Sequence, residues 1–287
     1  MPPERVSSSR HGLLRPDVAP WSPHRAVGSD QLEAYELEAY EHAGQIADAA
    51  GACLLALRDR LADGEDPWIL RDRADTVANK VILSELAARS PGVPVLSEES
   101  PDDPRRLATD QVWIVDPLDG TREWGEEGRD DWAVHVALVE AGTPVAGAVA
   151  LPARGLTFTS GAVRPPAGRV PARPRVMVSR TRPPRSVAPV RAAIDGVLVP
   201  MGSAGAKAMA VVLGEAELYL HAGGQYEWDS AAPVAVALAA GLHASRLDGS
   251  PLVYNQPDPW LPDLLICRVE LADRVLDTLA RVGRARH

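Results

Sequence analysis

The chain contains too few cysteines to form a disulfide framework. Among its 287 residues there are only two, Cys53 and Cys267, and they lie far apart in apolar surroundings. Small domains that are held together by disulfides carry several cysteines at short spacings. We therefore expect both residues to be buried thiols in a reducing compartment, and we expect the protein to be cytoplasmic.

Long apolar segments are also absent. No stretch of the sequence approaches the roughly 20 consecutive apolar residues that a membrane-spanning helix requires, and the N-terminus lacks the apolar core of a signal peptide. The apolar fraction of 46% and the charged fraction of 24% are typical of a soluble globular protein. We therefore expect no membrane partner.

The sequence also lacks the excess of positive charge that binding to a nucleic acid polymer requires. Its formal net charge is -9, so we expect no nucleic acid polymer as a partner. A small phosphorylated ligand remains compatible with this charge, because bound metal ions can supply positive charge. The seven histidines form no cluster with the spacing of metal ligands.

The composition divides the chain into segments. Residues 1–28 are rich in Pro, Ser and Arg and show no periodicity, which predicts a disordered tail. Residues 165–174 are rich in Pro and Gly and are the best candidate for a domain junction. This junction would separate an N-terminal α+β sub-domain at 29–164 from a C-terminal α/β sub-domain at 175–287.

Hydrophobic patterns predict helices and strands in both sub-domains. A helical pattern runs from Asp30, the expected N-cap, to Leu57, and a second helix is expected over 76–88. Strands are expected at 94–97, 112–115, 132–140, 145–151, 157–159, 175–179, 197–200, 217–221 and 264–269, and further helices at 206–213, 230–240 and 272–282. The alternation in the C-terminal half indicates sheet layers that are covered by helices.

The most informative feature is an acidic turn, Asp116-Pro117-Leu118-Asp119-Gly120-Thr121, which follows the apolar run 112–115. Two carboxylates therefore lie at the end of a predicted strand, beside the unpaired N–H groups that open a short helix. This combination suits a site that holds divalent cations together with a phosphate. A haloacid dehalogenase-type phosphatase is disfavoured, because Leu118 occupies the position of the second aspartate in its Asp-x-Asp motif.

Two further acidic elements, Glu98-Glu99 and Asp229, lie at a predicted strand end and a predicted helix start. Either one alone is compatible with a solvated charge, and Asp229 by itself is better explained as a helix cap. Taken in order with the acidic turn, and with Trp228-Asp229-Ser230-Ala231 as the last motif, they resemble the inositol monophosphatase-like superfamily of magnesium-dependent, lithium-sensitive phosphatases. The resemblance runs from about Asp30 to the C-terminus.

Within that superfamily the chain is similar to the CysQ branch, the 3'(2'),5'-bisphosphate nucleotidases, and particularly to its actinobacterial members. The stretches that carry this similarity are 95–99, 116–124, 128–135, 202–209, 218–224 and 228–232. The resemblance implies an α+β fold, a layered α/β/α/β/α sandwich of the inositol monophosphatase and fructose-1,6-bisphosphatase type. It also implies two sub-domains with the active site between them.

The resemblance implies that the protein binds two to three Mg²⁺ ions. Glu98, Asp116 and the backbone carbonyl of Leu118 would hold the first ion, and Asp116, Asp119 and Asp229 would hold the second. A third and weaker ion would contact Glu98 and water. A ligand set of oxygen atoms without histidine suits Mg²⁺ rather than zinc.

The resemblance also implies roles for Asp75 and Thr121. Asp75 would accept a hydrogen bond from Thr121, and Thr121 would orient and deprotonate a metal-bound water. The alternative for Asp75 is the N-cap of the second helix. The expected substrate contacts are Gly120, Thr121, Ser203, Lys207, His221 and Asp229.

The implied reaction removes the 3'-phosphate from 3'-phosphoadenosine 5'-phosphate in sulfur assimilation, with 3'-phosphoadenylyl sulfate as a further candidate substrate. His221 stands where such nucleotidases often carry an arginine, which leaves recognition of the second phosphate open. The alternative substrates are inositol 1-phosphate and fructose 1,6-bisphosphate. Inositol-specific members carry a carboxylate at the position of Ala222, which weakens the inositol alternative.

Several points remain open at this level. Arg129, Asp130 and Asp131 either flank the nucleotide or cap the sheet, and Trp124 and Trp132 are expected in the core. A non-catalytic relative is expected to have lost a metal carboxylate or the threonine. This alternative is disfavoured, because the chain keeps all of these residues. Both a monomer and a homodimer are compatible with the resemblance.

Overall fold

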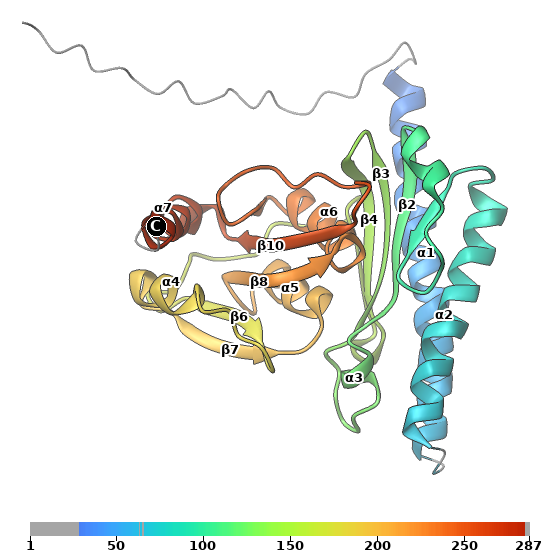
Figure 1. Ribbon diagram of the computed structural model, residues 1–287, viewed down its shortest axis with the longest axis horizontal. Coiled ribbons are helices and arrows are strands. Elements are labelled where there is room, and N and C mark those ends of the chain that lie inside the picture. Colours follow the sequence, from blue (N-terminus) through green and yellow to red (C-terminus); the bar gives the residue numbers. More distant parts are fainter. Residues whose placement is uncertain (1–28, 63, 65, 285–287) are drawn as a thin grey trace, which may run out of the picture.

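The computed structural model describes residues 29–62, 64 and 66–284. The tail that we predict at 1–28 lies outside these residues. Two five-stranded sheets and their helices stack in the order helix, sheet, helix, sheet, helix (Figure 1). The predicted five-layer α+β sandwich is therefore confirmed.

The first sheet follows the chain order β1-β2-β3-β4-β5. Its strands are β1 Val95–Ser97, β2 Gln111–Asp119, β3 Ala133–Glu140, β4 Thr143–Leu151 and β5 Leu156–Thr159. Strands β1 and β2 are parallel, and the other neighbouring pairs are antiparallel. Helices α1 (Ser29–Ala62) and α2 (Pro67–Arg89) cover its outer face, on the right in Figure 1.

Strand β2 shows why the strands of this sheet have continuous apolar sequences. Val112 and Ile114 belong to the core under the inner helices, whereas Trp113 and Val115 belong to the core under α1 and α2. Side chains alternate between the two faces of a strand, so a sheet that is covered on both faces needs apolar residues at every position. Trp124 and Trp132 lie in the same outer core, as expected, and both are fully buried.

The second sheet has the order β7-β6-β8-β10-β9. Its strands are β6 Arg175–Ser179, β7 Val197–Met201, β8 Leu218–Tyr226, β9 His243–Ser245 and β10 Trp260–Cys267. Helices α4 (Val187–Ile194) and α7 (Val269–Arg284) pack on its outer face through a separate apolar core. The two sheets are not hydrogen-bonded to each other among the described residues.

Two short helices, α5 (Ala204–Val212) and α6 (Ala231–Ala239), form the middle layer between the sheets. Their small side chains allow a close approach. A Cβ atom added to Gly147 on β4 would lie 2.6 Å from the Cβ of Ala235 on α6. This middle layer carries both helix starts that face the site described below.

Four short helical turns lie in the connections between these elements: η1 Pro104–Ala108, α3 Thr121–Trp124, η2 Pro152–Arg154 and η3 Glu227–Asp229.

Some predicted boundaries are wrong. Helix α2 begins at Pro67 instead of residue 76, because Leu70 and Ala74 are buried in the outer core and extend the helix toward its N-terminus. Asp75 therefore lies inside the helix, and its alternative role as an N-cap is wrong. Val269 begins α7 instead of ending a strand.

The helix α4, the strand β9 and the short turns η1 and η2 were not predicted at all. No helix or strand occurs between β5 and β6, and the sub-domain boundary that we place at 165–174 stays a prediction. Both cysteines are free, Cys267 buried and Cys53 only partly so. None of the helices in the described ranges is long and apolar enough to cross a membrane.

Candidate active site

The acidic turn lies at the end of β2, where the pairing with β3 breaks. The register shifts between Asp116 and Asp119, at Pro117, which has no N–H to donate to the ladder. Gly120 then adopts a left-handed conformation with φ 92° and leads into α3. The N–H of Leu118 donates to Asp116 Oδ1 at 3.0 Å and fixes that carboxylate. The sequence motif thus ends the strand and directs both aspartates to one edge of the sheet.

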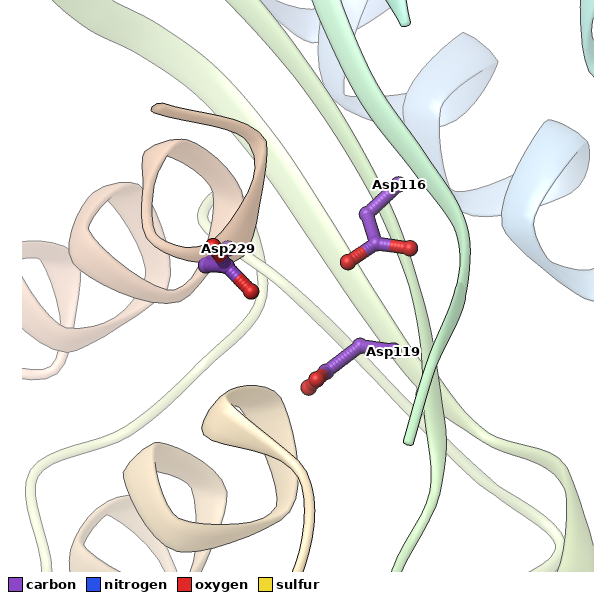
Figure 2. Close-up of side chains that lie close together, drawn as sticks. All are labelled: Asp116, Asp119 and Asp229. Carbon is purple, nitrogen blue, oxygen red and sulfur yellow. The ribbon is translucent and has the colours of Figure 1, made fainter. Parts of the chain in front are cut away.

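A third carboxylate, Asp229, faces these two from η3, just before α6. One carboxylate oxygen from each of Asp116, Asp119 and Asp229 lies within 4.8 Å of the others. Figure 2 shows Asp116 and Asp119 beside the end of β2 and Asp229 opposite them at the start of the helical segment that leads into α6. Asp116 is only 1% exposed. Two buried carboxylates and the partly buried Asp229, all of one charge, fit a hard divalent cation, and no histidine belongs to this group in the described part of the chain.

Glu98 joins the cluster because β1 runs parallel to β2. Ser97 pairs with Val115, so Glu98 follows β1 where Asp116 follows the same register on β2. Asn79 of α2 holds this strand end. It accepts a hydrogen bond from Ser97 Oγ at 2.9 Å and donates to Ser100 Oγ at 3.0 Å. Sequence reasoning missed Asn79, although it lies one helical turn after Asp75.

Burial and mutual repulsion raise the pKa values of these carboxyls in the metal-free protein. Burial, and then the charge of Asp119, raises the pKa of Glu98 to about 7. The same two causes raise the pKa of Asp229 to about 7. Burial, followed by the charges of Glu98 and Asp119, raises the pKa of Asp116 well above its usual range. A bound cation would remove this repulsion.

These shifts predict how Mg²⁺ and pH act together on stability. A carboxyl with a raised pKa binds more protons in the folded protein than in the unfolded chain. The metal-free protein should therefore lose stability as pH rises from about 4 to about 7. We expect Mg²⁺ to raise Tm by roughly 5 °C or more at about pH 8, and by less than half of that at about pH 5. Thermal melts at both pH values, with a chelator and with Mg²⁺, measure these Tm differences.

The matched variants for this experiment are Asp229→Asn in the cluster and Asp277→Asn on the exposed surface of α7. Asp229→Asn should raise the metal-free Tm at about pH 8 and reduce the Mg²⁺ shift, whereas Asp277→Asn should change neither. A Mg²⁺ shift of the same size at both pH values would contradict the predicted coupling.

Asp119 is oriented by the start of α5, a contact that sequence reasoning missed. Its Oδ2 accepts hydrogen bonds from Ser203 Oγ at 2.5 Å and from the N–H of Gly205 at 2.6 Å. Ser203 Oγ also accepts from the N–H of Ala206 and so caps the helix. Ser203, which we predicted as a substrate contact, therefore positions a carboxylate of the cluster.

His135 on β3 is a second residue to which sequence reasoning assigned no role. It is fully buried, and its Nδ1 donates to the carbonyl oxygen of Trp228 at 3.0 Å, while its Nε2 lies 3.4 Å from Asp119 Oδ2. Burial lowers the pKa of His135. It ties the backbone next to Asp229 to the first sheet, so the two halves of the cluster keep their spacing. The only available signal was its place in a strand of otherwise apolar residues.

The structure brings the predicted pair of Asp75 and Thr121 together. Thr121 Oγ1 lies 3.4 Å from Asp75 Oδ1 and 3.3 Å from the carbonyl oxygen of Leu118. Burial, and then the charge of Glu99, raises the pKa of Asp75 to about 7. A carboxyl with such a pKa can exchange a proton near neutral pH.

Three carboxylates of the cluster, Glu98, Asp119 and Asp229, line a cavity of about 490 Å³, and Asp116 is buried behind them. The lining of the cavity includes Glu98, Asp119, Gly120, Thr121, Ser203, Lys207, His221 and Asp229, together with arginines and aromatic residues. Lys207 is buried and donates to the carbonyl oxygens of Gly202 at 3.0 Å and Ser203 at 2.5 Å. His221 Nε2 lies 2.9 Å from the carbonyl oxygen of Gly224.

The segment 129–131, which follows α3 and whose role the sequence leaves open, contacts the loop before α5. Asp131 accepts a hydrogen bond from the N–H of Gly202 at 2.7 Å and also forms an ion pair with Arg129. Neither of these two residues lines the cavity. This arrangement favours the structural interpretation of the segment over a contact with the nucleotide.

Comparisons with known proteins agree with this geometry. The model of the inositol monophosphatase family matches residues 33–166 and 172–280. The chain is 54% identical over 246 residues to the 3'-phosphoadenosine 5'-phosphate phosphatase of Mycobacterium bovis, and the match covers 82% of this chain and 91% of that protein. It is 33% identical over 236 residues to the 3'(2'),5'-bisphosphate nucleotidase CysQ of Escherichia coli, with 76% and 94% covered.

Among solved structures, inositol monophosphatase II from Staphylococcus aureus has the same fold. It matches with a TM-score of 0.70 at 20% identity, and the match covers 83% of this chain and 94% of that chain. The resemblance that the motifs indicate is confirmed, and the chain belongs to the inositol monophosphatase family.

Proposed function

We propose that this protein is a Mg²⁺-dependent phosphatase that removes the 3'-phosphate of 3'-phosphoadenosine 5'-phosphate and releases AMP. The observation that carries the proposal is the convergence of Asp116, Asp119 and Asp229, of which Asp119 and Asp229 line a cavity of about 490 Å³. The similarity to a phosphatase named for this substrate, at 54% identity, supports the choice of substrate.

In this proposal the carboxylates of Glu98, Asp116, Asp119 and Asp229, with the carbonyl of Leu118, hold two to three Mg²⁺ ions. The bound ions would supply positive charge for the phosphate and lower the pKa of water. Ser203 and the N–H of Gly205 hold one oxygen of Asp119, so its carboxylate keeps one orientation. The N–H groups of Gly120 and Thr121 are the candidates for phosphate contacts.

Thr121 and Asp75 take up the proton that the attacking water loses. The Thr121 hydroxyl donates to Asp75 and can accept a hydrogen bond from the attacking water through its oxygen. Asp75 takes up the proton that passes through this hydroxyl, and its pKa of about 7 suits that role near neutral pH. Water attacks phosphorus directly as the bond to the ribose 3'-oxygen breaks, and this leaving oxygen takes up a proton from solvent water, so no covalent intermediate is required.

The second phosphate of the substrate needs a cation at a distance from the carboxylate cluster. Arg122, Arg180 and Arg182 line the cavity. Arg180 is engaged by Glu123 at 2.6 Å and by Glu126 at 3.0 Å. Neither Arg122 nor Arg182 forms a salt bridge with a described residue. Arg182 lies close enough to His221 to act on its pKa, which burial and the charges of Lys207 and Arg182 lower and the hydrogen bond with Gly224 raises. Arg182 is therefore our candidate for the second phosphate, and Lys207 and His221 remain candidates beside it.

A comparison of substrates tests the proposal. We expect kcat/KM for 3'-phosphoadenosine 5'-phosphate to exceed the values for inositol 1-phosphate and fructose 1,6-bisphosphate by about tenfold or more, which corresponds to about 1.4 kcal/mol of transition-state discrimination. The measurement is phosphate release by the purified protein with Mg²⁺. A preference for inositol 1-phosphate would leave the metal site intact but contradict the assigned substrate.

A further inference from the structure

Three aromatic side chains form one wall of the cavity. Tyr226, Trp228 and Trp260 all line it, and they come from the end of β8, from η3 and from the start of β10. Tyr226 and Trp260 are direct partners in the antiparallel pairing of β8 and β10. The rings of Tyr226 and Trp228 stack with their centroids 4.7 Å apart and an angle of 13° between their planes. We call Tyr226, Trp228 and Trp260 the aromatic wall.

Two members of the aromatic wall are exposed, whereas the tryptophans of the core are buried. Trp260 is 48% exposed and Tyr226 is 46% exposed, whereas Trp113, Trp124 and Trp132 are at most 2% exposed. Leaving large aromatic surface in water forgoes the free energy that burial provides. Exposed aromatic surface that gathers in a cavity indicates a flat apolar ligand.

The backbone holds Trp260 close to the end of β8. Gly224 has φ 94°, and a Cβ atom at this position would lie 2.6 Å from Nε1 of Trp260. Only glycine meets both requirements without strain. The contact of His221 with the carbonyl oxygen of Gly224 fixes the same segment of β8, where the register with β10 shifts between Leu261 and Asp263. The indole is therefore set in place beside this segment, although about half of its surface is free.

The position of the aromatic wall fits one part of the proposed substrate. The carboxylate cluster and the aromatic wall line the same cavity, which also has arginines on its lining. A nucleoside bisphosphate combines a reacting phosphate, a second phosphate and a flat base. The aromatic wall is the part of this lining that is not suited to bind a phosphate or a metal ion, so it is left for the base.

We propose that Trp260, with Tyr226 beside it, is the surface on which the purine base of the substrate stacks. This inference rests on the proposed function and adds the residues that select a nucleotide over a sugar phosphate. Bases stack on aromatic side chains because each presents a flat π face, and the contact is made before and during the reaction alike. Its loss should therefore raise KM and leave kcat nearly unchanged.

The test compares Trp260→Leu with Trp260→Phe and with Tyr35→Leu, an exposed aromatic residue outside the cavity lining. We expect Trp260→Leu to raise KM for 3'-phosphoadenosine 5'-phosphate roughly 10- to 100-fold. The value of kcat/KM for inositol 1-phosphate, which has no base, should not change. Trp260→Phe should restore most of the affinity, and Tyr35→Leu should behave as the wild type.

A binding titration provides a readout that does not depend on turnover. In the presence of Mg²⁺, AMP should quench the tryptophan fluorescence of the wild type, and ribose 5-phosphate should quench it much less. Trp260→Phe should still bind AMP, as measured by calorimetry, but with weaker quenching. Trp260→Leu should lose both the affinity and the quenching, and an unchanged Tm would show that the variant is folded.

The outcomes separate this inference from the proposed function. If the wild type releases no phosphate from 3'-phosphoadenosine 5'-phosphate, the proposed function is wrong, and the AMP titration still decides whether the base stacks on Trp260. If the wild type is active and Trp260→Leu changes neither KM for the nucleotide nor the affinity for AMP, the stacking surface is wrong while the function stands. Equal losses for the nucleotide and for inositol 1-phosphate would also overturn it.

Discussion

Replacing Asp116 by asparagine is expected to lower kcat/KM for phosphate release by at least about 1,000-fold, or about 4 kcal/mol. Asp116 is buried between β2 and η3, and the charges of Glu98, Asp119 and Asp229 all act on its carboxyl. An asparagine keeps the oxygen that accepts from the N–H of Leu118, but it replaces the charged oxygen with an NH₂ group. An amide NH₂ repels a cation, so the metal site should fail while the turn survives.

The Asp116→Asn variant should remain folded. Removing one of several crowded carboxylates relieves repulsion, so the Tm of the metal-free variant should equal or exceed that of the wild type at about pH 8. Asp277→Asn, which removes an exposed carboxylate on α7, serves as the control and should keep full activity. Steady-state phosphate release and circular dichroism measure both properties. Substantial turnover by a folded Asp116→Asn protein would remove the basis of the site assignment.

The second large effect is expected at Asp75. Asp75→Asn should lower kcat by about 100- to 10,000-fold, which is the usual contribution of a positioned general base. Asparagine retains an acceptor for the Thr121 hydroxyl but cannot take up its proton. Because the wild-type base must be deprotonated, kcat should rise as pH increases toward about 7, in line with the raised pKa of Asp75. The Asp75→Asn variant should lose this dependence.

Controls for Asp75 come from the same helix and from its partner. Asp72→Asn removes an exposed carboxylate one turn earlier on α2 and should leave kcat within a few-fold of the wild type. Thr121→Ser keeps the hydroxyl and should retain much of the activity, whereas Thr121→Val should resemble Asp75→Asn. The measurement is kcat as a function of pH for each variant. An Asp75→Asn protein with the wild-type rate and pH profile would show that Asp75 only supports the fold.

The parts of the site that lie close together in the sequence could be predicted from it. The acidic turn is contiguous, and the strand end, the proline and the glycine that shape it are its direct neighbours. Glu98 is brought to the same edge by simple parallel pairing of β1 with β2. The layered fold was expected mainly from the family resemblance, and the alternation of strands and helices after residue 175 supports it.

The parts that depend on contacts between distant segments could not be predicted. Ser203 was expected to contact the substrate and does line the cavity, but the bond of its hydroxyl to Asp119 became visible only from the way the start of α5 meets the end of β2. His135 looked like one polar residue in an apolar strand, and its carbonyl partner at Trp228 lies on another layer. Trp260 lay outside the strand that was predicted at 264–269, so its place beside Tyr226 gave no signal before the pairing of β8 with β10 was known.

Removing and restoring Mg²⁺ tests the central claim most directly. Protein stripped of metal by a chelator is given 3'-phosphoadenosine 5'-phosphate, and phosphate and nucleotide products are followed before and after Mg²⁺ is added. The account predicts no turnover by the stripped protein, recovery on addition of Mg²⁺, and AMP with its 5'-phosphate intact as the nucleotide product. Turnover that is indifferent to chelation, or a product that has lost the 5'-phosphate instead, would contradict it.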